Sequence, residues 1–279
     1  MLQQLQGELW GVDTFQLAFW GGIKTCKTTL GLTFPKPIIM LDLDRGFHRA
    51  KQRFTQFSIL ELQIGEELHP VHIDSGAQII VIPYQVPIKF PGQRSPDVLT
   101  LWNKIIQDVS IGCAHPLVKT IYYDTGSVLW LLCREAHLER LQAEPGKSAK
   151  QSLGQFEYSK PNAEMRALYT MPKAWGKNLV IAHHMTGKYE DRPKGGNSLE
   201  MEKVQVGFTW DGWGRVGGIV DVIGQTYINT NGETGSHPAM TIETCGLTLA
   251  SEGEVLVEPT YDYILSSIIA NRLAEAGSG

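Results

Sequence analysis

Short apolar runs recur along the chain, and longer segments with a helical spacing of apolar residues lie between them. Runs that predict buried strands precede the glycines of residues 14–30 and occupy residues 38–43, 78–84, 118–124 and 178–184. A strand that is covered on both faces has a nearly continuous apolar sequence, whereas a strand with one solvent-exposed face has alternating apolar and polar residues. The pattern therefore predicts an α/β fold with a mostly parallel sheet flanked by helices.

Helical segments are predicted between these runs. The segment of residues 28–34 is short because two prolines follow it. Ser95, Pro96 and Asp97 place a capping side chain and a proline at a helix start. Residues 58–76 fit neither pattern and are interpreted as an inserted excursion. Further helices are expected at residues 45–57, from residue 97 to about residue 110, at 127–141 and at 162–169.

The last part of the chain predicts antiparallel strands and a terminal helix. An Asn-Gly pair at residues 231–232, a common hairpin turn, lies between strand-like residues 218–228 and 239–247. Residues 204–210 form another predicted strand. Residues 261–276 have the apolar periodicity of an amphipathic helix.

Two polar segments, residues 143–161 and 185–203, are predicted to be mobile loops. The first is punctuated by glycine and proline, and the second holds four basic and four acidic residues, so its net charge is zero. Trp210 and Trp213 flank an Asp-Gly turn just beyond the second loop. Packing in the core or an interface is favoured for these two rings over stacking on a ligand.

Composition and charge narrow the class of protein. A chain of 279 residues with 42% hydrophobic content can form one large core, so residues 1–279 are interpreted as a single domain. A net charge of -4 excludes a globally basic protein that coats nucleic acid. Any nucleic-acid contact therefore requires a local patch.

The four cysteines are far apart and form neither C-x-x-C pairs nor clusters with zinc-site spacing, which fits a reducing cytoplasm. The N-terminus lacks the basic start and apolar run of a signal peptide. No window reaches the roughly 18 apolar residues of a membrane-spanning helix. A cytoplasmic protein without membrane contact is expected.

Residues 14–30 contain the strongest chemical signal. Gly21, four further residues, and then Cys26, Lys27 and Thr28 match G-x-x-x-x-G-K-[ST], except that Cys26 replaces glycine. In such a loop, backbone N–H groups face phosphate oxygens, while the lysine and threonine reach the outer phosphates and Mg²⁺. A Gly-rich turn before a lysine-bearing helix is the alternative, but the preceding strand favours an ATP cradle. The predicted cradle residues are Gly21, Gly22, Ile23, Lys24, Thr25, Cys26, Lys27, Thr28 and Thr29.

Polar residues follow three of the other predicted strands, and the carboxyl ends of parallel strands share one edge of a sheet. Asp42 and Asp44 lie at the end of one strand, Asp124 at the end of another and His184 at the end of a third. Beside a cradle, Asp124 is predicted to hold Mg²⁺ together with Thr28, directly or through water. Without the cradle, Asp124 would simply cap the next helix and His184 would be a structural histidine.

The cradle and the three polar strand ends together resemble the core of RecA-type ATPases. The segment QFEYSKPNAEMRALYTMPKAWGKNLVIAHH, residues 155–184, resembles bacteriophage RecA-like AAA-family ATPases, including those associated with single-strand annealing and recombination. The resemblance covers residues 12–230 and leaves a C-terminal hairpin and helix at about 231–276. It implies a RecA-like P-loop NTPase core and, for a phage-encoded protein, the host cytoplasm.

The resemblance also implies roles for individual residues. Asp44 polarises the attacking water, Lys27 binds the outer phosphates and His184 senses the γ-phosphate. The two polar loops face single-stranded DNA, and the candidate contacts are Lys147, Lys150, Lys188 and Arg192. Copies assemble into a ring or filament in which a neighbour's cation reaches the γ-phosphate. Lys188, Arg192, Lys194 and Arg215 are candidates for this cation, and the sequence does not choose among them.

The sequence departs from the RecA-type pattern in three places, and these departures rank how well each implied function is supported. Cys26 adds a side chain where the backbone approaches phosphate, and Asp44 is one methylene shorter than the usual glutamate. The neutral segment of residues 185–203 matches a phosphate backbone poorly. Nucleotide binding is therefore better supported than hydrolysis, and hydrolysis better than DNA binding. A nucleotide-bound scaffold that assembles with a protein partner is the main alternative, and a short packaging or unwinding motor is a weaker one.

Overall fold

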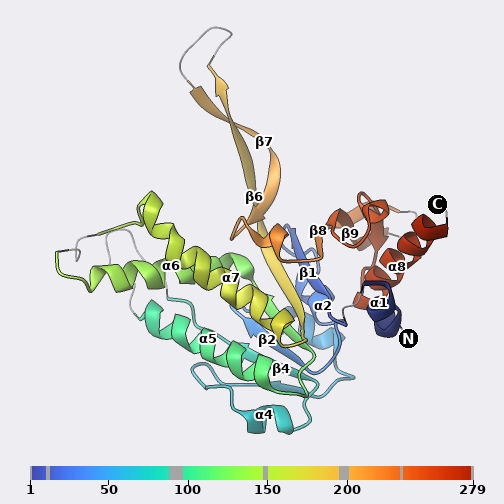
Figure 1. Ribbon diagram of the computed structural model, residues 1–279, viewed down its shortest axis with the longest axis horizontal. Helices are drawn as coiled ribbons and strands as arrows, with labels where there is room; N and C mark the ends of the chain where they lie inside the picture. Colours follow the sequence, from blue (N-terminus) through green and yellow to red (C-terminus); the bar gives the residue numbers. More distant parts are fainter. Residues whose placement is uncertain are drawn as a thin grey trace.

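The computed structural model describes residues 2–10, 13–87, 97–146, 150–194, 201–232 and 235–277. In these residues, one sheet has the strand order β10-β9-β8-β1-β6-β5-β2-β4-β3, with β7 paired to β6 (Figure 1). The strands are β1 (Gln16–Gly21), β2 (Ile38–Asp42), β3 (Ile59–Glu61), β4 (Ile79–Pro83), β5 (Thr120–Asp124), β6 (Asn178–Pro193), β7 (Met201–Asp211), β8 (Val222–Gly232), β9 (Gly235–Cys245) and β10 (Val255–Val257).

The centre of the sheet is parallel. β1 lies between β6 and β8 and pairs with both in parallel, and β5, β2, β4 and β3 continue the parallel pairing on one side. β9 and β10 add antiparallel strands at the other edge. The predicted α/β class, with a mostly parallel sheet and antiparallel strands near the C-terminus, is confirmed.

Helices cover both faces of the sheet. On one face, α5 (Val98–Ala114), α6 (Gly126–Gln142) and α7 (Ser159–Ala174) pack beside one another, and a small helix, α4 (Pro70–Asp74), adds Ile73 to the same core. The other face is covered by α2 (Lys27–Gly31), α3 (Phe47–Ala50) and α8 (Tyr261–Gly277). The N-terminal helix α1 (Leu2–Trp10) packs against α8. The inner strands are fully buried because both of their faces are covered, which explains their continuous apolar sequences.

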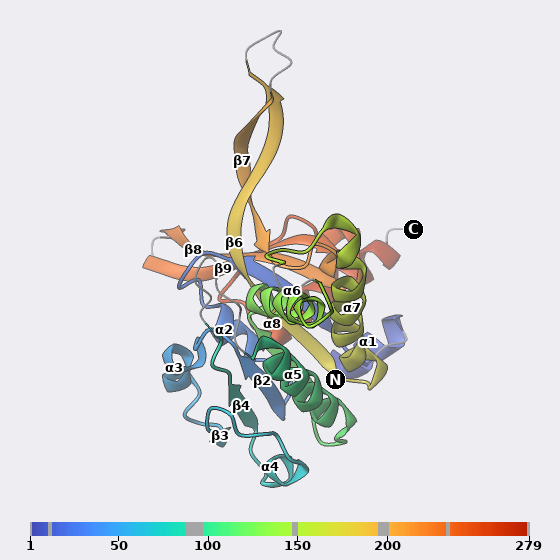
Figure 2. The same ribbon diagram turned by 90° about the vertical axis from the view of Figure 1, so that its left-hand side faces the viewer.

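The prediction of a mobile loop at residues 185–203 is wrong for the residues that the structure describes. β6 continues to Pro193 and pairs with β7 from Met201 onward, so a long antiparallel ribbon projects from the body (Figures 1 and 2). The ladder satisfies the backbone polar groups, although neither face of the ribbon is covered by a helix. A segment without a buried face shows no strong strand pattern, and this explains the error.

Several other boundaries differ from the predictions. The segment of residues 143–161 includes a 3₁₀ turn at Gln155–Tyr158, and α7 begins at Ser159. Residues 58–76 contain β3 and α4. Residues 231–232 lie at the end of β8 rather than in a turn. The proposed helix-start residues Ser95 and Pro96 lie outside the described residues.

Trp213 packs in the core, as predicted. It is 1% exposed, its ring meets Tyr169 edge to face, and its indole Nε1 donates to Asn162 Oδ1 over 2.8 Å. Among the helices of the described ranges, none has the length and apolar character needed to cross a membrane.

Candidate nucleotide-binding site

The loop between β1 and α2 is anchored tightly to the neighbouring strand β8. A methyl group added at Gly21 would lie 2.2 Å from the carbonyl oxygen of Thr226, so only glycine fits at this position. The Thr25 hydroxyl contacts the Thr226 hydroxyl at 2.9 Å and donates to the Gly22 carbonyl at 3.0 Å. The conformation of the loop is therefore held by contacts with β8 as well as by contacts within the loop.

Cys26 immediately precedes α2 in a left-handed backbone conformation, with φ of 63°. Glycine adopts this conformation without strain, whereas a residue with a Cβ pays for it by roughly 1–2 kcal/mol. The sequence pattern has glycine at this position because the backbone is left-handed there. In this chain Cys26 adopts the same conformation under strain. The thiol Sγ lies 3.7 Å from an Arg53 guanidinium nitrogen.

Lys27 reaches back over the loop. Its Nζ donates to the Gly21 carbonyl at 3.0 Å and to the Gly22 carbonyl at 2.6 Å. Burial lowers the pKa of Lys27, while the carboxylates of Asp124 and Asp44 act in the opposite direction. The ammonium group is thus partly desolvated and faces two acidic side chains, which suits it to bind an anion that arrives with a divalent cation.

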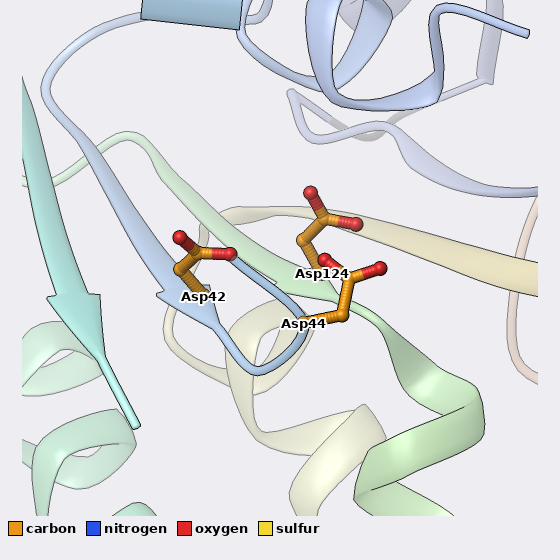
Figure 3. Close-up of side chains that lie close together, drawn as sticks. All are labelled: Asp42, Asp44 and Asp124. Carbon is orange, nitrogen blue, oxygen red and sulfur yellow. The ribbon is translucent and has the colours of Figure 1, made fainter. Parts of the chain in front are cut away.

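Three carboxyl groups gather where β2 and β5 end (Figure 3). Oxygen atoms of Asp42, Asp44 and Asp124 lie within 4.8 Å of one another. Asp42 and Asp124 are neighbours in register on the paired strands β2 and β5, and Asp44 follows β2. The Thr28 hydroxyl donates to Asp124 Oδ2 over 2.7 Å and so joins the P-loop helix to this cluster.

The cluster fits Mg²⁺, which prefers oxygen ligands. Gly46 keeps the space open, because a Cβ there would lie 2.7 Å from Thr28 Oγ1 and 2.8 Å from Asp124 Oδ2. Burial, together with the charge of Asp44, raises the pKa values of Asp42 and Asp124 to about 7. Negative charge is therefore crowded here, and a divalent cation would offset it.

His184 connects the acidic cluster to the middle of β6, where the strand leaves the parallel part of the sheet. Its Nε2 lies 3.2 Å from Asp44 Oδ2, and its backbone N–H donates to Ser127 Oγ at 2.8 Å. Burial acts to raise the pKa of Asp44, but the hydrogen bond and charge of His184, with the Gly46 N–H, lower it overall. Asp44 is thus held ionised in a fixed orientation.

A cavity of about 690 Å³ opens onto these groups. It is lined by all nine predicted cradle residues and by Asp44, Asp124 and His184, so the structure brings together the predicted catalytic, cradle and metal residues. Five lining residues were absent from the sequence predictions: Gly46, Arg49, Ala50, Arg53 and Met185. The two arginines are four residues apart in the segment that follows Asp44, so a helix there would place both on one face. This spacing is the sequence feature that could have identified them as cavity residues.

Within one chain, the described members of the predicted nucleic-acid set lie in two separate places. Lys150 is engaged in an ion pair with Glu157 at 2.9 Å, near the start of α7. Lys188 and Arg192 lie on the projecting ribbon, where Arg192 is 3.5 Å from Glu190. Lys147 lies outside the described residues. None of the three described cations lines the cavity of the P-loop.

One comparison with known proteins shows the family of the chain. A family model described as AAA domain matches residues 14–249. Among solved structures, the chain is similar to the KaiC-like protein PH0186 from the hyperthermophilic archaeon Pyrococcus horikoshii OT3. The two are 11% identical, with a TM-score of 0.41 and coverage of 88% of this chain and 89% of that chain. No curated protein matches the chain.

Proposed function

The chain belongs to the AAA domain family of nucleotide-binding ATPases, and we propose that it binds ATP with Mg²⁺ in the cavity beneath residues 21–29 and hydrolyses the nucleotide. The observation that carries the proposal is the convergence of Lys27, the Thr28–Asp124 hydrogen bond and Asp44 at the mouth of one glycine-lined loop. A partly buried ammonium beside a carboxylate cluster matches the opposite charges of a phosphate chain and its metal ion.

The phosphates would bind along the loop. The first N–H groups of α2 have no partners within the helix and point toward the incoming anion. Lys27 now contacts neutral carbonyls, and a phosphate oxygen offers its ammonium a stronger, charge-assisted hydrogen bond. Thr28 and Asp124 are the residues that would hold Mg²⁺. When bound, the ion offsets the negative charge that develops on the outer phosphates.

Asp44 is assigned to the attacking water. Its carboxylate accepts hydrogen bonds from the Gly46 N–H at 2.9 Å and from His184, so its orientation is fixed before substrate arrives. An ionised, oriented carboxylate at the edge of the cavity can hold a water molecule and accept its proton. His184 is proposed to detect the outer phosphate, and its contact with Asp44 supports this role.

We further propose that the ATP cycle acts on single-stranded DNA, in phage recombination, annealing or replication, and that copies associate in a ring or filament. The support is the sequence resemblance, together with the exposed positions of Lys188 and Arg192 on the projecting ribbon. Alternation of these cations with carboxylates on the ribbon weakens the electrostatic support for DNA. A nucleotide-bound scaffold with little turnover is therefore the second candidate, and the strained Cys26 favours it.

The experiment is a measurement of phosphate release with Mg²⁺ and ATP, with and without a single-stranded oligonucleotide, beside equilibrium binding of ATP. Stimulated turnover is expected for a DNA-dependent ATPase. Turnover that ignores the oligonucleotide removes the DNA proposal and leaves the ATPase. Binding without turnover selects the scaffold, and absence of binding overturns the nucleotide proposal itself.

A further inference from the structure

The ribbon formed by residues 185–193 of β6 and 201–210 of β7, here termed the arm, carries Lys188 and Arg192, but its other side chains have no role in the function proposed above. It stands away from the body of the molecule in two perpendicular views (Figures 1 and 2). Its ladder runs from the pair Met185 and Trp210 to the pair Pro193 and Met201. A two-stranded ribbon is marginal in water by itself, so a surface on a partner is expected to cover at least one face.

The register of the ladder shows that one face of the arm is apolar. Residues that are directly opposite in a ladder share a face, and alternate residues along a strand share it too. One face therefore carries the apolar residues Met185, Trp210, Phe208, Tyr189 and Met201, and the polar residues Gln205, Asp191 and Lys203 lie among them. Trp210, at the base of the arm, is partly buried against the core of the body. Tyr189, Met201 and Phe208 are each more than half exposed, at 57%, 58% and 55%.

A glycine shapes this face. Gly187 is opposite Phe208, and a Cβ at Gly187 would lie 2.9 Å from the Tyr189 ring. The Tyr189 ring thus leans along the arm over Gly187, the residue opposite Phe208, and the Gln205 side chain lies beside it. We call the surface made of the five apolar residues named above the apolar face.

The opposite face of the arm is mostly polar. It carries the cross-strand pairs Thr186 and Thr209, Glu190 and Val204, and Arg192 and Glu202. Residues 185–203 contain four basic and four acidic residues, so the arm attracts neither a polyanion nor a strongly basic partner. The occupant of the apolar face is therefore a surface with balanced charge.

We propose that the apolar face is the surface through which the arms of two copies of this chain pack together. Asp191 and Lys203 are cross-strand partners on the same side of the ladder as the apolar residues. In a two-fold arrangement, the same patch meets itself, so Asp191 of each copy can face Lys203 of the other while the aromatic rings interdigitate. The face is thus complementary to itself in charge as well as in polarity.

The apolar face also reaches the candidate nucleotide site, because Met185 lines the cavity of the P-loop. A copy that packs along the face from Met201 to Met185 would close over this side of the cavity. Nucleotide and association are then expected to strengthen one another, since linkage between two binding events is reciprocal. This coupling rests on the proposed function, whereas arm pairing itself does not.

The test is the mass of the full chain by light scattering over a concentration series, with and without a non-hydrolysable ATP analogue. The wild type is expected to exceed its monomer mass of 31.0 kDa. In the double variant Tyr189→Ser and Phe208→Ser, the dissociation constant for association should rise at least tenfold. The matched control, Glu190→Ser with Val204→Ser on the polar face, should associate as the wild type does.

A charge exchange tests the same pairing without removing apolar side chains. Asp191→Lys should weaken association because it faces Lys203 of the second copy, and adding Lys203→Asp should restore it. A wild type that stays at 31.0 kDa, unchanged association of the Tyr189 and Phe208 variant, or failure of the charge rescue would overturn the proposal. Loss of oligonucleotide binding without a change in association would instead identify a base-stacking surface. ATP binding measured on the same samples separates failure of arm pairing from failure of the nucleotide proposal.

Discussion

The Thr28 hydroxyl lies 2.7 Å from Asp124 Oδ2, so the first turn of the P-loop helix is joined to the end of a strand 96 residues further along the chain. The parallel pairing of β5 with β2 then brings Asp42 into the same cluster. The metal site is thus a consequence of sheet order, because strands that are separated in sequence end at one edge.

Substitutions of Asp124 and Asp44 should separate metal binding from turnover. Asp124→Asn removes a charged oxygen from the predicted Mg²⁺ site, so the dissociation constant for ATP with Mg²⁺ should rise at least tenfold, or about 1.4 kcal/mol. Asp44→Asn should keep the affinity within about threefold and lower kcat by about 100-fold or more, because it removes the proton acceptor. Calorimetric binding with and without a chelator, beside steady-state rates, measures both. Equal loss of affinity in the two variants would contradict the assignment.

Cys26→Gly should tighten nucleotide binding. Glycine relieves the left-handed strain at φ of 63° and removes a side chain from the closest approach of the backbone to phosphate. ATP affinity is expected to rise severalfold, with no loss in melting temperature. Cys26→Ala is the control, because alanine removes the thiol but keeps a Cβ in the left-handed conformation. It should therefore not gain affinity from relieved strain. Cys113→Gly would be a poor control because Cys113 is buried. Weaker binding by Cys26→Gly would show that the thiol contributes to the site.

The buried strands could be predicted from the sequence, whereas the arm could not. Strands such as β2 and β5 are buried on both faces, and this burial requires the nearly continuous apolar sequences that predicted them. The arm has one polar and one exposed apolar face, with a register shift between Lys188 and Tyr189 that interrupts the alternation. Its charged residues and glycines therefore gave the pattern of a loop.

The site was predictable only where a local pattern encodes it. The spacing from Gly21 to Thr28 and the acidic ends of the strands are local features, and the structure gathers them around one cavity. The contact of Thr25 with Thr226 joins residues 201 positions apart, and no local pattern announces such a pair. Ser127 was likewise assigned only to a helix, although it bonds to both β6 and β7.

Ser127 should position His184. Its hydroxyl accepts from the His184 N–H and donates to the Asp211 carbonyl at 2.5 Å, and so joins the middle of β6 to the end of β7. Ser127→Ala should lower kcat severalfold while ATP affinity is kept, and it should cost about 1–3 kcal/mol of stability. Ser127→Thr retains the hydroxyl and should recover much of the rate. Ser110→Ala, which removes a hydroxyl bonded within its own helix, is the control. Unaltered kcat in Ser127→Ala would exclude a positioning role.

His183 should make the protein sensitive to acid. Burial lowers the pKa of His183 to about 4 from an ordinary value of 6.5, although its contact with the Asp211 carbonyl acts in the opposite direction. Between these two pH values, the unfolded chain takes up a proton that the folded chain excludes. The free energy of unfolding should therefore fall as pH decreases through this window, by up to about 3 kcal/mol from this group.

Chemical denaturation of the wild type and His183→Asn across pH 7 to 4 measures this effect. Asp42 and Asp124 have raised pKa values and stabilise the folded state as pH falls, but they are present in both proteins. The difference between the two profiles isolates His183. The free energy of unfolding of the wild type, minus that of His183→Asn, should decrease as pH falls. In the wild type alone, protonation of this histidine favours the unfolded chain. A difference that does not change with pH would show that His183 does not titrate in this way.

The most direct measurement of the central claim is the affinity of a non-hydrolysable ATP analogue for the wild type and for Lys27→Gln, by titration calorimetry with Mg²⁺. Gln keeps much of the length of the side chain but removes the charge that faces the outer phosphates. The wild type should bind, and Lys27→Gln should lose binding by at least 100-fold, about 2.7 kcal/mol. Lys119→Gln, at the opposite end of the sheet, should bind like the wild type. Undiminished affinity in Lys27→Gln would contradict the assignment of this loop as the nucleotide cradle.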